Sequence, residues 1–153
     1  MVNRLRNGVR AQLTVARNCG VCRAMSSRIA TIAVVVADYA EAIAFYRDRL
    51  GFEVIADTDM GGDKRWVVVA APGGGARLLL AKADGPEQAA RIGDQTGGRV
   101  AFFLETDNFA RDFAAFSAAG VRFLEAPRHE PYGSVAVFED LYGNKWDLIE
   151  PKG

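Results

Sequence analysis

The second half of this chain repeats the first at an offset of 68 residues, which relates Thr31 to Arg99 and Leu79 to Asp147. Each copy reads as a short apolar strand, a helix that ends near a glycine, and three further strands. The predicted elements are Ile29–Val36, Ala40–Arg49, Glu53–Ala56, Arg65–Ala70 and Arg77–Ala81 in the first copy, and Val100–Leu104, Phe109–Ala119, Arg122–Glu125, Ser134–Phe138 and Lys145–Ile149 in the second. An internal repeat dictates how a chain closes on itself. We therefore expect one pseudo-symmetric domain of two strand–helix–strand–strand–strand units, with any site where the units meet.

The boundaries of the repeat divide the chain into an extension and one domain. We predict an N-terminal extension at 1–27 and a single domain at 28–151, made of module one at 28–83, a linker at 84–98 and module two at 99–151. The extension is rich in arginine and free of acid, as some organelle transit peptides are, but we interpret it as a segment outside the fold. Both cysteines, Cys19 and Cys22, fall in it, and we interpret them as ordinary thiols because zinc needs four ligands. A domain without cysteine is typical of a cytoplasmic protein.

Charge is distributed unevenly although the formal net charge is zero. Residues 1–28 hold six arginines and no acid, so the rest of the chain holds 13 basic and 19 acidic residues, a balance of −6. An acidic body argues against nucleic acid, which needs a clustered positive surface. No apolar run reaches the length of about 18 residues that a membrane span needs, so we expect no membrane partner.

Local patterns support the first module in detail. Ile32, Val34 and Val36 alternate onto one face of their strand. Asp38 follows this strand and is placed to cap the helix. Gly51 is placed to end that helix in the left-handed conformation. In module two, the adjacent carboxylates Glu139 and Asp140 precede a Gly-Asn turn, so we interpret them as turn-capping residues rather than as an acid/base pair.

Two motifs resemble a known family. The series Asp38, Phe45-Tyr46 and Leu50-Gly51-Phe52 resembles the first-module signature of the vicinal oxygen chelate superfamily, and the run Phe138–Asp147 resembles its closing signature. That superfamily includes glyoxalase I, extradiol dioxygenases, fosfomycin-modifying enzymes and bleomycin-binding proteins. The resemblance covers about residues 28–151. It implies an α+β fold in which two tandem βαβββ modules form a curved mixed sheet, an open barrel, around a cleft, often in a homodimer.

The resemblance also locates the positions that hold a metal ion in metal-using members of the family. These positions correspond here to Thr31, Leu79, Arg99 and Asp147. The expected side chains are histidine, glutamine or glutamate, whereas this chain offers a hydroxyl, an aliphatic group, a guanidinium and one carboxylate. The single histidine, His129, lies at none of these positions, and nitrogen-rich metal sites need at least two imidazoles. We therefore expect no cofactor; a divalent metal held by oxygen ligands is the disfavoured alternative.

Other polar and aromatic residues are candidates for the cleft. Alternation places Arg99 and Phe103 on one strand face and Asp147 on a neighbouring one, so we predict that Arg99 and Asp147 meet where the metal would lie. They either hold a ligand or form a structural ion pair. The predicted ligand-binding cleft consists of Arg99, Asp147, Thr31, Arg65, Phe103, Glu130 and Tyr132. For Trp66 and Trp146 we favour core positions.

Three functions remain open from the sequence. The favoured one is a bleomycin-resistance-like protein that binds a small molecule, either flat or cationic, in an aromatic cleft without a standard metal site. The alternative is a glyoxalase-like lyase or isomerase with an atypical metal site at Asp147, or with Arg99 as a charge stabiliser. A dimerising scaffold without a ligand is the third. The sequence assigns no catalytic residue and names no substrate.

Overall fold

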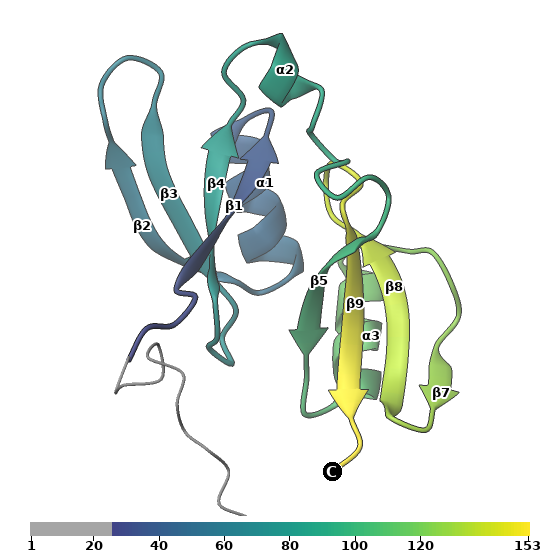
Figure 1. Cartoon of the computed structure of the whole chain (residues 1–153). Helices are drawn as coiled ribbons and strands as arrows, with labels where there is room; N and C mark the ends of the chain where they lie inside the picture. The colour runs from purple at the N-terminus through teal and green to yellow at the C-terminus, as the bar shows by residue number, and fades with distance from the viewer. Residues whose placement is uncertain (1–25) are drawn as a thin grey trace, which may run out of the picture.

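The computed structural model describes residues 26–153 and consists of two βαβββ modules (Figure 1). Module one comprises β1 (Thr31–Val36), α1 (Tyr39–Ala44), the π-helical turn η1 (Phe45–Arg49), β2 (Glu53–Asp59), β3 (Arg65–Ala70) and β4 (Arg77–Lys82). The short helix α2 (Pro86–Ala89) lies in the linker, and module two comprises β5 (Val100–Glu105), α3 (Phe109–Ala118), β6 (Arg122–Phe123), β7 (Arg128–Glu130), β8 (Gly133–Glu139) and β9 (Lys145–Pro151). The interpretations of Cys19, Cys22 and residues 1–25 lie outside the described residues.

The two modules form separate mixed sheets of equivalent topology. Module one has the strand order β1-β4-β3-β2, and module two has the order β5-β9-β8-β6 with β7 added beside β8. In each sheet the first strand runs parallel to the last, and the other pairs are antiparallel. The predicted α+β class with tandem βαβββ modules is confirmed. Within residues 26–153 the modules contribute two unclosed sheets rather than one continuous sheet, with β1 and β5 at the facing edges (Figure 1).

The local signals of module one act as predicted. The Asp38 carboxylate accepts hydrogen bonds from the backbone N–H groups of Ala40 and Glu41, at 2.8 and 3.0 Å, and so caps α1. The helix widens to π geometry at η1, which turns both Phe45 and Tyr46 into the core. Gly51 follows with φ of 70°, a left-handed conformation that a glycine adopts without strain.

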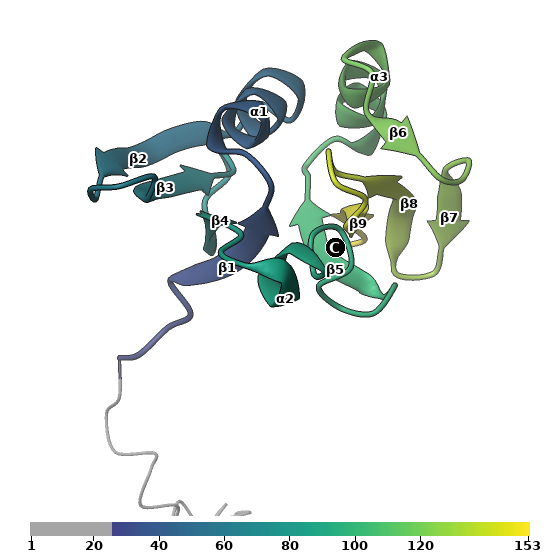
Figure 2. The ribbon, with the colours of Figure 1, turned by 90° about the horizontal axis from the view of Figure 1, so that it is seen from above.

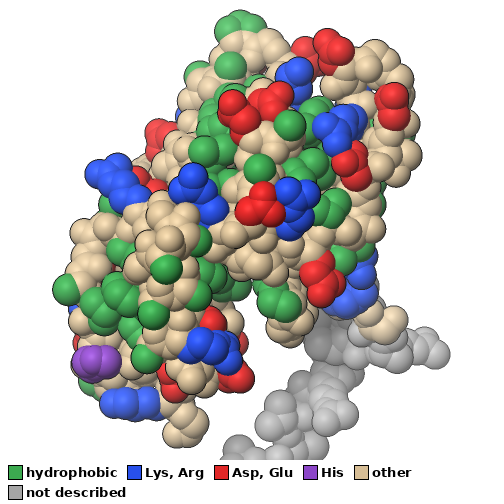
Figure 3. Space-filling view, turned by 180° about the vertical axis from the view of Figure 1, so that it is seen from behind, with side chains coloured by type: hydrophobic (Ala, Val, Ile, Leu, Met, Phe, Trp, Pro, Cys, Tyr) green, Lys and Arg blue, Asp and Glu red, His purple; other side chains and the backbone are tan. Residues whose placement is uncertain are grey.

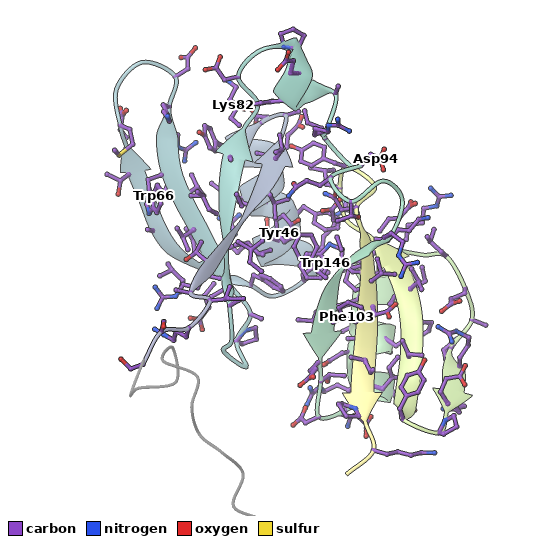
Figure 4. The ribbon with its side chains drawn as sticks, in the orientation of Figure 1. Tyr46, Trp66, Lys82, Asp94, Phe103 and Trp146 are labelled. Carbon is purple, nitrogen blue, oxygen red and sulfur yellow. The ribbon has the colours of Figure 1, made fainter. Side chains whose placement is uncertain are left out.

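A hydrophobic core joins the modules on their helical side. Val34, Val36 and Leu80 of module one are fully buried, and they belong to one cluster with Phe138 and Leu148 of module two. Trp146 is 3% exposed, so its predicted core position is confirmed. Its ring lies 6.1 Å from that of Tyr46 across the module boundary (Figure 4).

Two hydrogen-bonded contacts fix the modules against each other, and a third holds the linker on module one. The Tyr46 hydroxyl donates to the buried Asp140 carboxylate at 2.8 Å, and Asp140 also accepts from Asn144 and from the backbone N–H of Tyr142. Asp140 therefore caps its turn, as predicted, and in addition binds the opposite module. The Tyr142 hydroxyl contacts the backbone of Asp38 at 3.2 Å.

The third contact covers the free edge of β1. The side-chain amide of Gln95 in the linker accepts from Val35 N at 2.8 Å and donates to Ala33 O at 2.8 Å. It satisfies the two backbone groups that an adjacent strand would otherwise bond. Gly93 enables this approach, because a Cβ there would lie 1.9 Å from the Tyr142 carbonyl oxygen.

Both long helices lie on the same side of the molecule, behind the sheets in Figure 1 and above them in Figure 2. Seen from behind, the surface carries acidic and basic side chains that are interspersed, and a notch separates the modules at one end (Figure 3). The opposite face of each sheet carries neither α1 nor α3 and is here named the helix-free face; the short α2 lies on this side of the molecule, beside β1 (Figure 2). Among residues 26–153 no helix combines the length and apolar character that a membrane span requires.

Candidate functional site: two helix-free sheet faces

The helix-free face of module one carries an aromatic groove, here named the Trp66 groove. Strand register places Trp66, Val68 and Leu79 on this face, opposite the core residues Val67 and Leu80. Trp66 is 48% exposed, so its predicted core position is wrong. The groove has a volume of about 640 Å³ and is lined by Trp66, Leu79, Ala81, Lys82, Gln88 and neighbouring residues at the same end of the sheet. It offers an indole face and aliphatic side chains to a flat ligand, together with the charged residues Asp63, Lys64, Arg65, Lys82 and Asp84 in its lining.

The helix-free face of module two carries a second aromatic group beside a carboxylate, here named the Phe103 face. Phe103 is 65% exposed and lies in register with Asp147, which in turn lies in register with Val137. The three side chains therefore cross neighbouring strands in one row. Asp147 is half-buried, between an aromatic ring and an aliphatic side chain.

Asp147 is poorly solvated and lacks a hydrogen-bond partner on one oxygen. Its Oδ1 atom is shielded from solvent, and no donor among residues 26–153 reaches it. Burial raises the pKa of the Asp147 carboxyl above its ordinary value, the nearby Arg128 guanidinium opposes this shift, and Glu125 adds to it. A carboxylate held in this way has an unused capacity to accept a hydrogen bond.

Arg128, the cation that lowers the pKa of Asp147, is held by two other carboxylates. Arg128 Nε donates to Glu125 Oε1 at 2.9 Å, and Arg128 Nη1 donates to Glu130 Oε1 at 2.8 Å. These two carboxylates raise the pKa of the Arg128 guanidinium. Glu125 also accepts from Val137 N at 3.2 Å and so fills the gap in the sheet between β6 and β7.

The structure separates the predicted partners Arg99 and Asp147. Arg99 is exposed, it forms no ion pair among the described residues, and only its carbonyl oxygen makes a hydrogen bond, from Thr96 Oγ1 at 2.7 Å. A register shift in β5 between Val100 and Phe102 explains the separation, because it interrupts the alternation that relates Arg99 to Phe103. Phe103 instead lies opposite Asp147.

Arg65 also lies away from the helix-free faces. It shares the helical side of β3 with Val67, where it pairs with Asp57 and lies 5.3 Å from the ring centroid of Tyr39. Its pKa is raised, chiefly by the hydrogen bond to Asp57. Arg65 borders the end of the Trp66 groove but is committed to these two partners.

The remaining predicted residues occupy the rims. Thr31 is exposed at the start of β1, in register with Arg77. Glu130 is engaged by Arg128, and Tyr132 is 55% exposed in the turn before β8. His129 points to the side of the hairpin opposite Glu130, and its Nδ1 lies 3.0 Å from Ser134 Oγ.

The donor set at the family's metal positions does not fit a metal ion. Thr31 and Leu79 offer a hydroxyl and a methyl-bearing side chain, and Arg99 offers only a cation. Asp147 is the one anionic ligand among the four positions. Within residues 26–153 no group of three or more His, Cys, Asp or Glu side chains has a geometry that would hold a metal. We derive no chemistry through a metal from these residues.

Three features of the site escaped the sequence patterns. The exposure of Trp66 was hidden because Val67, Val68 and Val69 are apolar in succession and show no alternation. Glu125 and Arg128 were hidden because they flank a Pro-containing connection, and because the strand β7, which begins at Arg128, has only three residues and no periodic signal. The only sequence signal there is Pro127, which indicates a turn between β6 and β7.

Comparisons with known proteins agree with this fold. A family model described as the Glyoxalase/Bleomycin resistance protein/Dioxygenase superfamily matches residues 28–148, and the chain belongs to this superfamily. An uncharacterised protein of Shewanella frigidimarina (strain NCIMB 400) is 53% identical over 128 residues, which cover 82% of this chain and 95% of the relative.

Two solved structures are similar in fold and sequence. The crystal structure of UcmS2 superposes with a TM-score of 0.71 at 30% identity and covers 82% of this chain and 98% of its own. TnmS3, described as an antibiotic binding protein from Streptomyces sp. CB03234, superposes with a TM-score of 0.68 at 30% identity and covers 84% of this chain and 99% of its own. These similarities identify the family and the fold of the chain.

Proposed function

We propose that this protein binds a planar aromatic small molecule against the helix-free faces of its sheets, without a metal ion. The observation that carries the proposal is the Trp66 groove, in which a half-exposed indole lies beside Leu79 in a hollow of about 640 Å³. A large aromatic side chain left exposed on a rigid sheet is a stacking surface.

Further support comes from the Phe103 face. Phe103 presents a second ring, 65% exposed, on a strand that is held on its other side by the packing of Phe102 on Trp146. Rigid aromatic anchors lose little conformational entropy when a ligand stacks on them. The description of TnmS3 as an antibiotic binding protein, at 30% identity over most of both chains, supports the same class of function here.

We also propose that a second copy of the chain completes the site. Both helix-free faces look to the same side of the protomer, away from α1 and α3 (Figures 1 and 2). A two-fold axis on that side would place the Trp66 groove of one copy opposite the Phe103 face of its partner, and would do so twice. The resulting homodimer would enclose two equivalent clefts, each with a ring on both walls. The cell compartment that suits such a cysteine-free domain is the cytoplasm.

The test combines ligand titration with two matched variants. Purified protein is titrated with a panel of planar polycyclic compounds by calorimetry, and its mass is measured by light scattering. We expect a dimer that binds at least one compound, with affinity reduced about tenfold in Trp66→Ala, since base-like stacking on one aromatic ring contributes on the order of 1–3 kcal/mol. The control Leu141→Ala removes an equally accessible apolar side chain from the β8–β9 turn and should leave binding unchanged. Equal effects of both variants, or no binding, would overturn the proposal.

The alternative of a lyase or isomerase receives no support from this geometry. It requires either a metal, which the donor set does not fit, or Arg99 as a charge stabiliser beside Asp147. Arg99 forms no ion pair with Asp147 among the described residues, and it lies outside the row that contains Phe103. Turnover of a small oxygenated substrate by the purified protein would revive this alternative.

A further inference from the structure

The carboxylate of Asp147 lies beside the ring of Phe103, where it would face the edge of a ligand stacked on that ring. The two residues are directly paired across β5 and β9, so their side chains stand next to each other on the Phe103 face. Phe103 is exposed and Asp147 is half-buried, which puts the carboxylate at the base of the ring. The pairing therefore offers a stacking surface and a hydrogen-bond acceptor within one binding position.

The protein itself supplies no donor to the shielded oxygen of Asp147. Its Oδ1 has no partner among residues 26–153. Arg128 is engaged by Glu125 and Glu130, and Lys145, two residues earlier on the same face, donates to the Gly98 carbonyl oxygen at 3.1 Å. Both nearby cations thus have other partners. Shielded carboxylate oxygens are nearly always hydrogen-bonded, so this exception calls for an explanation, which a donor on a ligand at the Phe103 face would supply.

We propose that the ligand carries an N–H or O–H donor at the edge of its aromatic system, and that Asp147 selects it by accepting that hydrogen bond. The inference rests on the proposed function, because it names the chemical class of the ligand bound by the same site. Rotation about the terminal side-chain torsion of Asp147, which is soft, presents either oxygen to the donor. Asp147 is then a specificity-determining residue, and ligands of the same shape without the donor are rejected because the carboxylate stays unpaired.

Two probes of nearly equal shape test the inference. Acridone is planar, uncharged and fluorescent and carries one N–H donor, whereas N-methylacridone replaces that donor with a methyl group. The dissociation constants of both are measured by the fluorescence anisotropy of the probe in the intact full-length protein. We expect acridone to bind about tenfold or more tightly than N-methylacridone, as a hydrogen bond to a charged acceptor allows.

Variants at position 147 separate the hydrogen bond from the size of the methyl group. Asp147→Leu keeps the γ-branched shape but removes the acceptor, so the preference for acridone should fall to about one, which a steric effect of the methyl group would not do. Asp147→Asn keeps an acceptor oxygen and should retain part of the preference. The control Glu105→Gln changes an exposed carboxylate of β5 that lies two residues from Phe103 and pairs with Ile149 rather than with Asp147, and it should leave the preference intact. The thermal midpoint of each variant confirms that it is folded.

The outcomes distinguish this inference from the proposed function. Equal binding of both probes to the wild-type protein, or a preference that survives in Asp147→Leu, would overturn the donor inference and leave the aromatic binding site standing. Failure of both probes to bind would count against both proposals. Loss of the preference in Asp147→Leu alone, with Glu105→Gln unchanged, is the result that the structure predicts.

Discussion

Two regions of the molecule are rich in aromatic side chains: the boundary between the two modules, and the helix-free faces of the two sheets. The aromatic side chains are buried at the module boundary and exposed on the helix-free faces. At the module boundary Tyr46 and Trp146 are buried against each other, and the Tyr46 hydroxyl is bonded to Asp140. On the helix-free faces Trp66 and Phe103 lie on different sheets and are about half-exposed or more (Figure 4). The same residue types thus stabilise the fold in one region and remain available in the other.

The carboxylates of the two regions, Asp140 and Asp147, differ in a related way, although Trp146 Nε1 at the boundary is also buried without a hydrogen-bond partner among residues 26–153. Asp140 accepts four hydrogen bonds, from Tyr46, from Tyr142 and twice from Asn144. Burial, and next the charge of Asp140, raise the pKa of Tyr46 well above its ordinary value, so its hydroxyl stays a donor. Asp147 has an unpaired oxygen on an accessible face. The four hydrogen bonds of Asp140 give it a structural role, whereas the unpaired oxygen of Asp147 is the basis of the proposed hydrogen bond from a ligand.

The largest expected difference is between the two tryptophans. Trp146→Ala should lower the free energy of unfolding by about 4 kcal/mol, because it empties the centre of the shared core. Trp66→Ala should lower it by about 1 kcal/mol or less, because that ring is half-exposed. Urea unfolding at one fixed protein concentration measures both values. Equal losses would show that Trp66 is part of the core and is not a binding surface.

The next largest difference is between adjacent carboxylates. Asp140→Ala leaves four donors without their acceptor and should cost about 3 kcal/mol in the free energy of unfolding. Glu139→Ala removes an ion pair with Arg122, whose side chain is 76% exposed, and should cost at most about 1 kcal/mol. Urea unfolding again gives both values. A larger loss in Glu139→Ala would contradict the assignment of Asp140 as the link between the modules.

The order and type of the elements could be predicted from the sequence because their signals are local. The predicted strand Arg65–Ala70 has the bounds that the structure shows, and the predicted helix Phe109–Ala119 differs by one residue. Alternation and caps act over a few residues and depend little on the rest of the chain. The short elements α2 and β7 were missed, because four and three residues carry no periodic pattern.

The site could be predicted only in part, because it depends on register and on exposure. Asp147 and Phe103 were both named from alternation, and the structure places them together. The expected meeting of Arg99 with Asp147 failed, since a one-residue shift in β5 cannot be read from an apolar run. Trp66 was assigned to the core because no local pattern tells which face of a wholly apolar strand is covered.

The smallest expected effect concerns pH and sharpens the contrast between the two carboxylates. Burial raises the pKa of Asp147 above its ordinary value of 3.8. At pH values between the pKa of Asp147 in the unfolded chain and its higher pKa in the folded protein, the folded protein binds more protons than the unfolded chain. The free energy of unfolding therefore falls as the pH rises through this range. Asp147→Asn cannot titrate at this position and should not show this decrease. The free energy of unfolding of the variant, measured relative to that of the wild type, should therefore increase from low to neutral pH. Parallel pH profiles in urea unfolding would contradict the shielded position of Asp147.

Mixing two defective variants tests most directly whether the two faces of different copies form one site. Trp66→Ala and Asp147→Leu are unfolded together, refolded in equal amounts and titrated with acridone to count the tight sites. If each site joins the Trp66 groove of one copy to the Phe103 face of its partner, half of the dimers are mixed and each carries one intact site, so about a quarter of the sites should bind tightly. No recovery of tight sites in the mixture would contradict the account, because a site within one copy is defective in both variants.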